Sequence, residues 1–147
     1  MRQIKLKTQF EFDSAHRLVG YSGKCNQLHG HLWRVELEII GDKKDLDEIG
    51  ILWDFSLRKK LVDIFDHKTI LKDCEENRKL IKLLWDMTEK NSVYLMNENP
   101  TAENLCYEIL KLLTDINLNF NLLKYINLKF KVIVWESPKS SCEVESK

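Results

Sequence analysis

Two long stretches of polar and apolar alternation constrain the fold of this chain more than any other feature. The apolar face of residues 3–16 carries Ile4, Leu6, Phe10, Phe12 and His16, and that of residues 29–40 carries His29, His31, Trp33, Val35, Leu37 and Ile39. Alternation with a period of two is typical of a strand with one buried and one solvated face. The two segments therefore predict neighbouring strands, joined as a hairpin by the loop at residues 17–28.

The rest of the chain indicates helices followed by further strands. Apolar residues recur at helical spacing in residues 53–65, 75–90 and 98–113, and alternation returns in residues 125–136 and in a short stretch from Cys142 to Glu145. No internal repeat or linker divides the chain, so residues 1–147 predict a single domain. The order of elements predicts the α+β class, with an antiparallel four-stranded sheet and helices packed on one face.

Composition limits the functions open to the chain. Its 147 residues are enough for one hydrophobic core, and 23 Lys and Arg residues balance 23 Asp and Glu residues. A nucleic-acid binder usually carries a basic surplus, so this balance argues against such a partner. No apolar run reaches the roughly 20 residues of a membrane span, and residues 1–16 lack the apolar core of a signal peptide. We therefore expect a cytoplasmic protein with no membrane partner.

Histidine is scarce in this chain, and its placement points to a metal ion. Of four histidines, His16, His29 and His31 lie on the apolar faces of the two predicted strands, close to the loop that joins them. Paired strands would bring all three imidazoles together, and three histidines with an open fourth position are typical of catalytic zinc. Two alternatives stay open. Each histidine is a separately bonded core residue, or Cys25 closes a structural Cys–His₃ zinc site.

Each cysteine needs its own interpretation, because a cytoplasmic chain rarely forms disulfides. No two cysteines form a CxxC pair among Cys25, Cys74, Cys106 and Cys142. Cys25 follows Lys24 in a loop that contains glycine, where a nearby cation favours the reactive thiolate. Asp66 and His67 come at the end of the first predicted helix. A carboxylate, an imidazole and a thiolate form a proton-relay set. The alternative for Asp66 and His67 is ordinary helix termination.

Glu136 ends the apolar phase of the strand at residues 125–136. A carboxylate on the inward face is costly to bury unless it has a partner, and a ligand with adjacent N–H donors would satisfy both of its oxygens. The alternative is that the strand has already ended and Glu136 points to solvent.

Several short motifs occur in an order that resembles one enzyme family. They are FDSAH (Phe12 to His16), CNQLHGH (Cys25 to His31), WDF (Trp53 to Phe55), DHK (Asp66 to Lys68), PTAEN (Pro100 to Asn104) and WESP (Trp135 to Pro138). Together they resemble the 6-pyruvoyltetrahydropterin synthase / 6-carboxytetrahydropterin synthase family of tunnelling-fold enzymes. Residues 73–98 are longer than in compact members, and we expect an added helix with a short strand there.

The resemblance implies roles for the residues identified above. His16, His29 and His31 would bind zinc, Cys25 would be the catalytic thiol with Asp66 and His67 as relay partners, and Glu136 would anchor the pterin. Thr101 and Glu103 would line the pterin pocket. From charge and location, Lys24 and Arg17 are candidates for holding a triphosphate. The resemblance also implies a homohexamer of two stacked trimers, with sheets joined into a β-barrel and active sites at subunit boundaries.

The spacing in the cysteine motif selects a branch of the family. Three residues, Asn26 to Leu28, separate Cys25 from His29, which resembles the bacterial 6-carboxytetrahydropterin synthases of the queuosine pathway. The expected activity is a zinc-dependent lyase that converts 7,8-dihydroneopterin triphosphate to 6-carboxy-5,6,7,8-tetrahydropterin and releases acetaldehyde and triphosphate. Two alternatives are a 6-pyruvoyltetrahydropterin synthase, which releases no acetaldehyde, and a non-catalytic pterin-binding protein with structural zinc.

Overall fold

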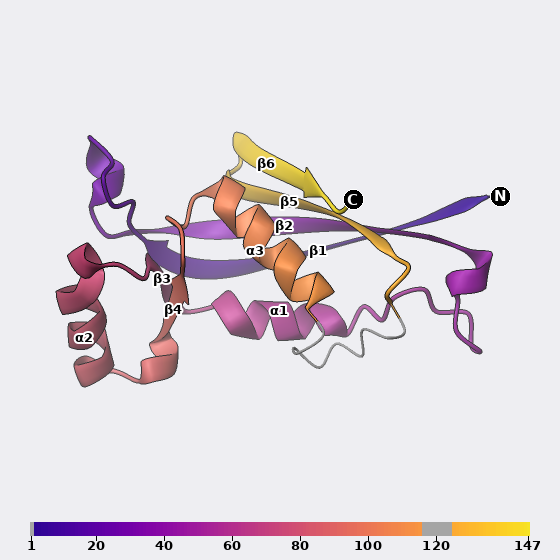
Figure 1. Cartoon of the computed structure of the whole chain (residues 1–147), viewed down its shortest axis with the longest axis horizontal. Coiled ribbons are helices and arrows are strands. Elements are labelled where there is room, and N and C mark those ends of the chain that lie inside the picture. The colour runs from indigo at the N-terminus through magenta and orange to yellow at the C-terminus, as the bar shows by residue number, and fades with distance from the viewer. Residues whose placement is uncertain (1, 116–124) are drawn as a thin grey trace.

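The computed structural model describes residues 2–115 and 125–147 and shows one mixed six-stranded sheet with helices against it (Figure 1). The strands are β1 (Gln3–His16), β2 (His29–Asp42), β3 (Lys68–Lys72), β4 (Val93–Met96), β5 (Lys129–Ser137) and β6 (Ser140–Glu145), and the helices are α1 (Leu57–Phe65), α2 (Arg78–Met87) and α3 (Ala102–Thr114). The strand order across the sheet is β4-β3-β1-β2-β5-β6. The predicted α+β class is confirmed.

The long hairpin of β1 and β2 is the centre of the sheet, as the alternation predicts. The two strands are antiparallel and in register from Gln3 opposite Asp42 to His16 opposite His29. Their inward side chains form much of the core, with Phe12 and Trp33 almost fully buried. Since one face is apolar and mostly buried, a slip of one residue would expose the whole apolar set, and this fixes the register.

The predicted four-stranded antiparallel sheet is wrong in strand number and direction. Strand β3 pairs in parallel with β1, and β4 pairs in parallel with β3. Both are short, and β3 is buried on both faces, because Ile70 joins the main core while Leu71 joins a second apolar cluster. A strand buried on both sides shows no polar alternation, so residues 68–72 carry no strand signal.

The helices cover both faces of the sheet rather than one. Helices α1 and α3 pack on the face that holds the main core, as predicted. Helix α2 instead packs over the β3–β4 edge, where Leu71, Ile81 and Val93 form the second cluster. Successive residues of β3 point to opposite faces, so Ile70 and Leu71 place α2 on the side away from α1 and α3.

Several predicted boundaries shift in the structure. The strand expected at residues 125–136 begins at Lys129, and Ile126 lies in a turn with 68% of its surface exposed. The helix expected at residues 75–90 spans Arg78–Met87, with short 3₁₀ turns at Glu75–Asn77 and Lys90–Ser92. The short final strand near Cys142 is confirmed as β6.

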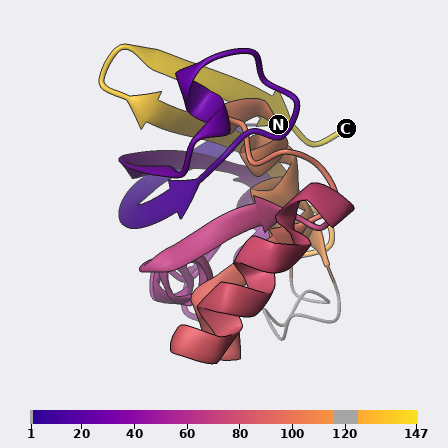
Figure 2. The ribbon, with the colours of Figure 1, turned by 90° about the vertical axis from the view of Figure 1, so that its left-hand side faces the viewer.

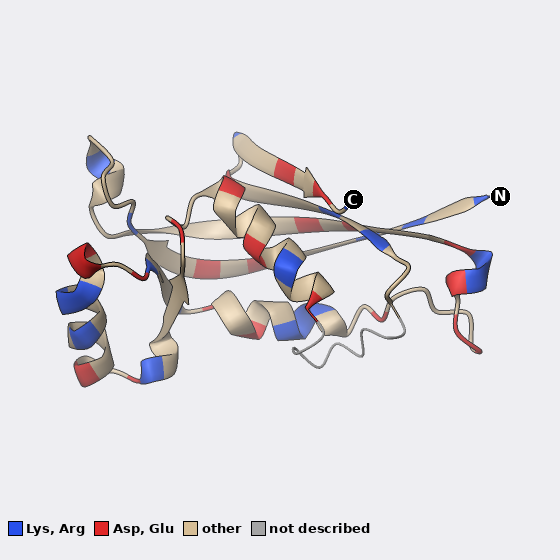
Figure 3. Ribbon diagram, viewed as in Figure 1, with Lys and Arg blue, Asp and Glu red and all other residues tan. Residues whose placement is uncertain are grey.

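Basic and acidic residues alternate along several elements of the described chain. Figure 3 shows basic and acidic positions interspersed along α2, α3 and the strands, in line with the balanced composition. Within residues 2–115 and 125–147, no helix is long and apolar enough to cross a membrane.

Candidate metal centre and active site

The loop end of the β1–β2 hairpin brings the three predicted histidines together. Strand pairing sets His16 directly opposite His29, and His31 lies two residues further along the same face of β2. One ligand atom from each of His16, His29, His31 and Glu136 lies within 4.8 Å of the others. The three histidines therefore converge as the alternation predicts, and the carboxylate of Glu136 joins them. Figure 2 views the molecule from this end.

Backbone carbonyls fix the orientation of two of these rings. Nδ1 of His16 lies 2.7 Å from the carbonyl oxygen of Pro100, and Nδ1 of His29 lies 2.7 Å from that of Gln27. A carbonyl oxygen only accepts, so each Nδ1 donates its proton and each neutral ring keeps a lone pair on Nε2. Such carbonyl contacts are the usual outer support of metal-binding histidines.

The Nε2 atoms of His16 and His29 point toward each other, so a cation between them would be stabilised. Nε2 of His16 lies 3.1 Å from Nε2 of His29, although neither nitrogen carries a proton in the neutral rings. In tetrahedral coordination with bonds of about 2.0–2.1 Å, two nitrogen ligands lie about 3.3 Å apart. Nε2 of His31 is buried and makes no hydrogen bond within the described residues. The residues therefore fit a bound metal ion held by three imidazole nitrogens, with the Glu136 carboxylate beside it.

Burial keeps the imidazoles in the form that binds metal. The pKa of His16 is lowered to about 4, mainly by burial and to a smaller extent by the neighbouring His29 and His31, against the opposing effect of the bond to Pro100. Burial also lowers the pKa of His31, against the opposing charge of Glu136. Neutral imidazole is the ligand form, so these side chains offer lone pairs at neutral pH.

Glu136 faces the histidines rather than solvent. Its Oε1 lies 3.1 Å from Nε2 of His31 and 3.7 Å from Nε2 of His16, while its side chain stays 33% exposed. The His31 contact is short but lacks the geometry of a hydrogen bond. The pairing of β5 with β6 shifts register between Trp135 and Ser137. A bulge of this kind re-aims a side chain, and the predicted inward orientation of Glu136 is present.

Cys25 lies in the loop between β1 and β2, in a 3₁₀ turn formed by Lys24–Asn26. The thiol is half-buried and reduced. Among the described residues, the metal-binding group contains no cysteine. The structure therefore favours an open three-histidine site over the closed Cys–His₃ alternative.

Asp66 and His67 form a pair at the end of α1. Oδ2 of Asp66 accepts a hydrogen bond from Nδ1 of His67 at 2.9 Å, and its Oδ1 accepts one from the backbone N–H of Asp13 at 2.9 Å. The Asp13 N–H lowers the pKa of the Asp66 carboxyl, burial opposes this effect, and His67 lowers the pKa further. The His67 N–H donates to the Asp13 carbonyl at 2.8 Å, and the Ser14 hydroxyl donates to the Phe65 carbonyl.

His67 lies just beyond the C-terminal end of α1. It follows the helix with φ of 57°, which is the one positive φ of a non-glycine residue in the described part of the chain. Left-handed conformations are unfavourable for residues with a β-carbon and concentrate at functional sites. Its side chain is 81% exposed, and it lines an open depression together with His31, Gly30 and Lys68. Within the described chain His67 makes no hydrogen bond to Cys25.

The other predicted binding residues do not join the histidine group. Lys24 and Glu103 are exposed, and Thr101 caps α3 by accepting a hydrogen bond from the Asn104 N–H at 3.2 Å. The Arg17 guanidinium donates to the backbone and side-chain oxygens of Asn26.

Sequence reasoning missed the residues that support the site. Asn99 and Asn26 hold the loop that carries Cys25, and the carbonyl of Pro100 orients His16. The PTAEN motif marks the neighbourhood, but nothing in it distinguishes a supporting amide from an exposed one. Any residue type can provide a backbone carbonyl, so the sequence does not indicate which carbonyl supports a histidine.

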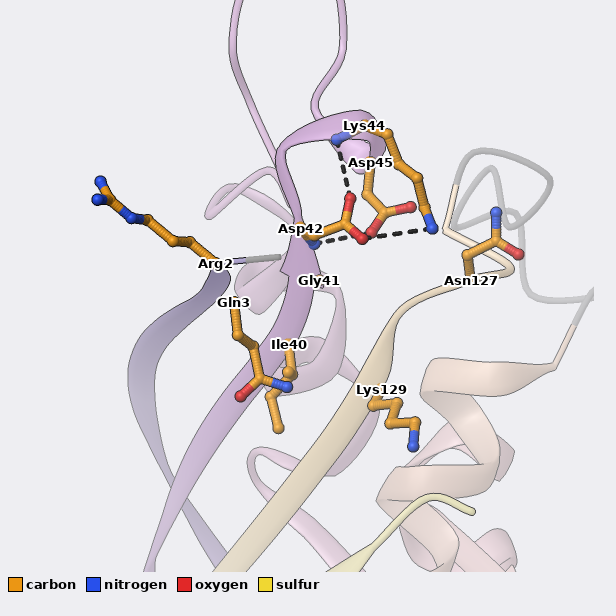
Figure 4. Close-up of a pocket in the computed structure, with 9 residues that line it drawn as sticks. All are labelled: Arg2, Gln3, Ile40, Gly41, Asp42, Lys44, Asp45, Asn127 and Lys129. Carbon is orange, nitrogen blue, oxygen red and sulfur yellow. Dashed lines mark hydrogen bonds and ion pairs between the residues drawn. The ribbon is translucent and has the colours of Figure 1, made fainter.

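A second depression lies at the opposite end of the hairpin (Figure 4). It is lined by Arg2, Gln3, Ile40, Gly41, Asp42, Lys44, Asp45, Asn127 and Lys129. Gln3 and His16 are 13 residues apart on β1. At about 3.3 Å per residue, the two ends are separated by about 40 Å. Its two aspartates bond to local backbone N–H groups of the turn at Lys43–Asp45, so this depression has no part in the histidine site.

The fold and the site together define an α+β protein with a candidate metal centre of the open, catalytic type. Comparison with known proteins supplies the family. The model of the 6-pyruvoyl tetrahydropterin synthase family matches residues 5–147, so the chain belongs to that family. The resemblance seen in the motifs is confirmed.

Relatives share both sequence and fold. The chain is 36% identical over 111 residues to the 6-carboxy-5,6,7,8-tetrahydropterin synthase of Rickettsia bellii, covering 72% of this chain and 77% of that one. It is 30% identical over 149 residues to the enzyme of the same name from Haemophilus influenzae, covering 97% and 99%. Among solved structures, a catalytic-residue mutant of the 6-pyruvoyltetrahydropterin synthase of Plasmodium vivax superposes with a TM-score of 0.71 at 22% identity, covering 100% of this chain and 99% of that one. An uncharacterised Wolinella succinogenes protein gives 0.75 at 18% identity, covering 100% of both chains.

Proposed function

We propose that this protein is a zinc-dependent 6-carboxy-5,6,7,8-tetrahydropterin synthase. It converts 7,8-dihydroneopterin triphosphate and water to the 6-carboxy product, acetaldehyde and triphosphate, a step toward queuosine and other 7-deazapurines. The observation that carries the proposal is the group of His16, His29, His31 and Glu136, with a free cysteine in the adjoining loop. Relatives that carry this name match along most of the chain.

His16, His29 and His31 hold the metal through their Nε2 atoms, which the backbone carbonyls leave unprotonated on the first two rings. A bound zinc ion supplies Lewis acidity, which lowers the pKa of a coordinated hydroxyl group. Glu136 anchors the pterin, because a carboxylate accepts two hydrogen bonds from adjacent N–H groups.

Proton transfer falls to Cys25 and to the Asp66–His67 pair. The Asp66 carboxylate holds the proton of His67 on Nδ1, which leaves Nε2 to take up or release a proton. Cys25, as a thiolate, removes a proton from the substrate, and His67 returns one, so that triphosphate leaves as an anion. In this scheme Lys24 is a candidate contact for the triphosphate, and Thr101 and Glu103 lie beside the pterin.

Product analysis tests the proposal. The enzyme is incubated with 7,8-dihydroneopterin triphosphate and zinc, and the pterin products and acetaldehyde are measured by mass spectrometry. We expect one acetaldehyde for each triphosphate released and a 6-carboxy product. A 6-pyruvoyl product without acetaldehyde would assign the second activity known in the family. Absence of turnover together with tight pterin binding would assign a binding protein instead.

We also infer that a second copy of the chain completes the active site, within the hexamer of two trimers that the family resemblance implies. His67 is 81% exposed and does not contact Cys25 within the described chain. Closed symmetric assemblies commonly build sites from two subunits. Inactive Cys25→Ala and His67→Ala subunits are co-refolded and assayed. Activity in the mixture, absent from either variant alone, supports a shared site, whereas an inactive mixture that has exchanged subunits contradicts it.

A further inference from the structure

The loop between β1 and β2 is closed by Arg17. Its Nε donates to the backbone oxygen of Asn26 at 2.9 Å, and its Nη2 donates to the side-chain oxygen of Asn26 at 2.7 Å. Beside this fork, the Leu18 N–H donates to the Cys25 carbonyl at 2.9 Å. A planar guanidinium with two parallel bonds fixes orientation as well as distance. Asn26 directly follows Cys25, so the fork fixes the residue next to the thiol.

Asn99 anchors the same loop to the rest of the molecule. Its Oδ1 accepts from the Val19 N–H at 2.9 Å, and its Nδ2 donates to the Val19 carbonyl at 2.8 Å. One amide side chain thus satisfies both backbone groups of Val19, as a neighbouring strand would. The Asn99 carbonyl accepts from the Thr101 N–H at 2.8 Å and from Nδ2 of Asn104 at 2.9 Å. These contacts tie Asn99 to the beginning of α3.

The anchor and the metal centre share one short segment of chain. Asn99 holds the loop that carries Cys25, and the next residue, Pro100, provides the carbonyl that orients His16. A displacement of this segment would therefore move the thiol loop and the metal-facing ring together. Catalysis is sensitive to displacements of about 1 Å, so we expect a change in this shared support to lower the rate of the reaction.

We propose that Arg17 and Asn99 are positioning residues that hold Cys25 in a fixed place relative to the histidine group. Of its two tests, the alkylation rate of Cys25 is independent of the proposed function, and only the measurement of kcat and KM rests on it. It also gives Arg17 a role different from triphosphate binding, because two edge donors of its guanidinium are already engaged by Asn26. A lysine at this position keeps the charge but loses the fork.

The test uses Arg17→Lys and Asn99→Ala in the full chain, each with a matched control. Arg58→Lys alters an exposed arginine whose guanidinium donates to the carbonyls of Phe55 and Gln9. Asn97→Ala alters an exposed asparagine two residues before Asn99. The first readout is the rate at which iodoacetamide alkylates Cys25, followed by peptide mass spectrometry with Cys74 as the internal reference. The second readout is kcat and KM for 7,8-dihydroneopterin triphosphate.

Loosening the loop exposes the half-buried thiol, so alkylation of Cys25 should rise at least about fivefold in both variants, with Cys74 and both controls within about twofold of wild type. In the same variants kcat should fall at least about tenfold while KM stays within about twofold, as expected when reacting groups lose their alignment. If Asn99→Ala fails to fold, Arg17→Lys, a change in a surface loop, decides the matter.

Two results would overturn the proposal. Cys25 alkylation that stays within twofold of wild type, or slows, shows that the contacts do not position the loop. A raised KM with unchanged kcat in Arg17→Lys assigns Arg17 to substrate binding. If the wild-type enzyme does not turn over this substrate, the proposed function fails, and the alkylation rates alone still decide the role of Arg17 and Asn99.

Discussion

At the scale of single residues, the chemistry of the site follows from which nitrogen carries each proton. Carbonyls take the Nδ1 protons of His16 and His29, and the two Nε2 lone pairs then face each other at 3.1 Å. Two lone pairs at that distance repel unless a cation lies between them. Glu136 adds a negative charge on the same side. A bound cation or an added proton relieves this repulsion, and the donor set fits a metal ion that imidazole binds, such as zinc.

Glu136 provides a prediction that separates a pterin anchor from a metal ligand. Glu136→Gln keeps the shape, removes the charge and turns one acceptor into a donor that faces a pterin N–H group. Substrate affinity should fall at least about tenfold, equivalent to about 1.4 kcal/mol. Zinc content, measured by atomic emission, should stay at the wild-type value. Loss of zinc would make Glu136 a metal ligand, and unaltered substrate binding would remove its anchoring role.

The ionisation of Asp66 makes the free energy of unfolding depend on pH in the acid range. Because the pKa of its carboxyl is held down by the Asp13 N–H, the folded state prefers the ionised form. The resulting stability is fully present above the ordinary carboxyl pKa and is lost as pH falls through the lower pKa of the folded state. With a side chain 33% exposed, Asp66→Asn should cost at most about 1 kcal/mol at neutral pH. Urea unfolding of both proteins checks this, and a difference that persists unchanged in acid would contradict it.

At the scale of elements, the sequence predicts what alternation can encode. It predicts β1, β2, the core of β5 and the position of α3, because each presents one apolar face. It fails for β3, which has 5 residues and packs against apolar groups on both sides, whereas β4 is the short strand expected within residues 73–98. Parallel pairing adds to the difficulty, since the partners of β3 are distant along the chain and no turn residue marks them.

The second apolar cluster should be energetically separate from the metal centre. Ile81 is 3% exposed and packs against Leu71 and Val93, on the face of the sheet away from α1 and α3. Ile81→Ala should cost about 2–5 kcal/mol of unfolding free energy through lost burial and a cavity. Leu83→Ala, on the exposed side of the same helix, is the control and should change it by less than about 0.5 kcal/mol.

Metal content decides whether the two regions are separate. Chemical denaturation gives the unfolding free energy of each α2 variant, and atomic emission gives its zinc. We expect Ile81→Ala to retain full zinc content while it remains folded. Zinc lost in proportion to stability would show that α2 supports the metal centre.

At the scale of the whole molecule, the sheet joins two ends with different roles. The end near His16 collects the histidines, Glu136 and the loop of Cys25, while at the end near Gln3 the two aspartates of the depression bond to backbone N–H groups of the local turn. The three histidines come from β1 and β2, so a bound ion would cross-link the two central strands of the sheet. Ligands that bind only the folded state raise its stability, so zinc should raise the thermal midpoint of the entire domain.

The central claim is a metal ion held by three histidines with the catalytic thiol outside the ligand set. The most direct measurement is zinc per chain, by atomic emission after loading and exhaustive dialysis, for the wild type, Cys25→Ala and His31→Ala. Three-histidine sites bind one ion and need every ligand, so we predict about one zinc per chain in the wild type and in Cys25→Ala and almost none in His31→Ala. Loss of zinc in Cys25→Ala, or a wild type that retains none, would contradict the account.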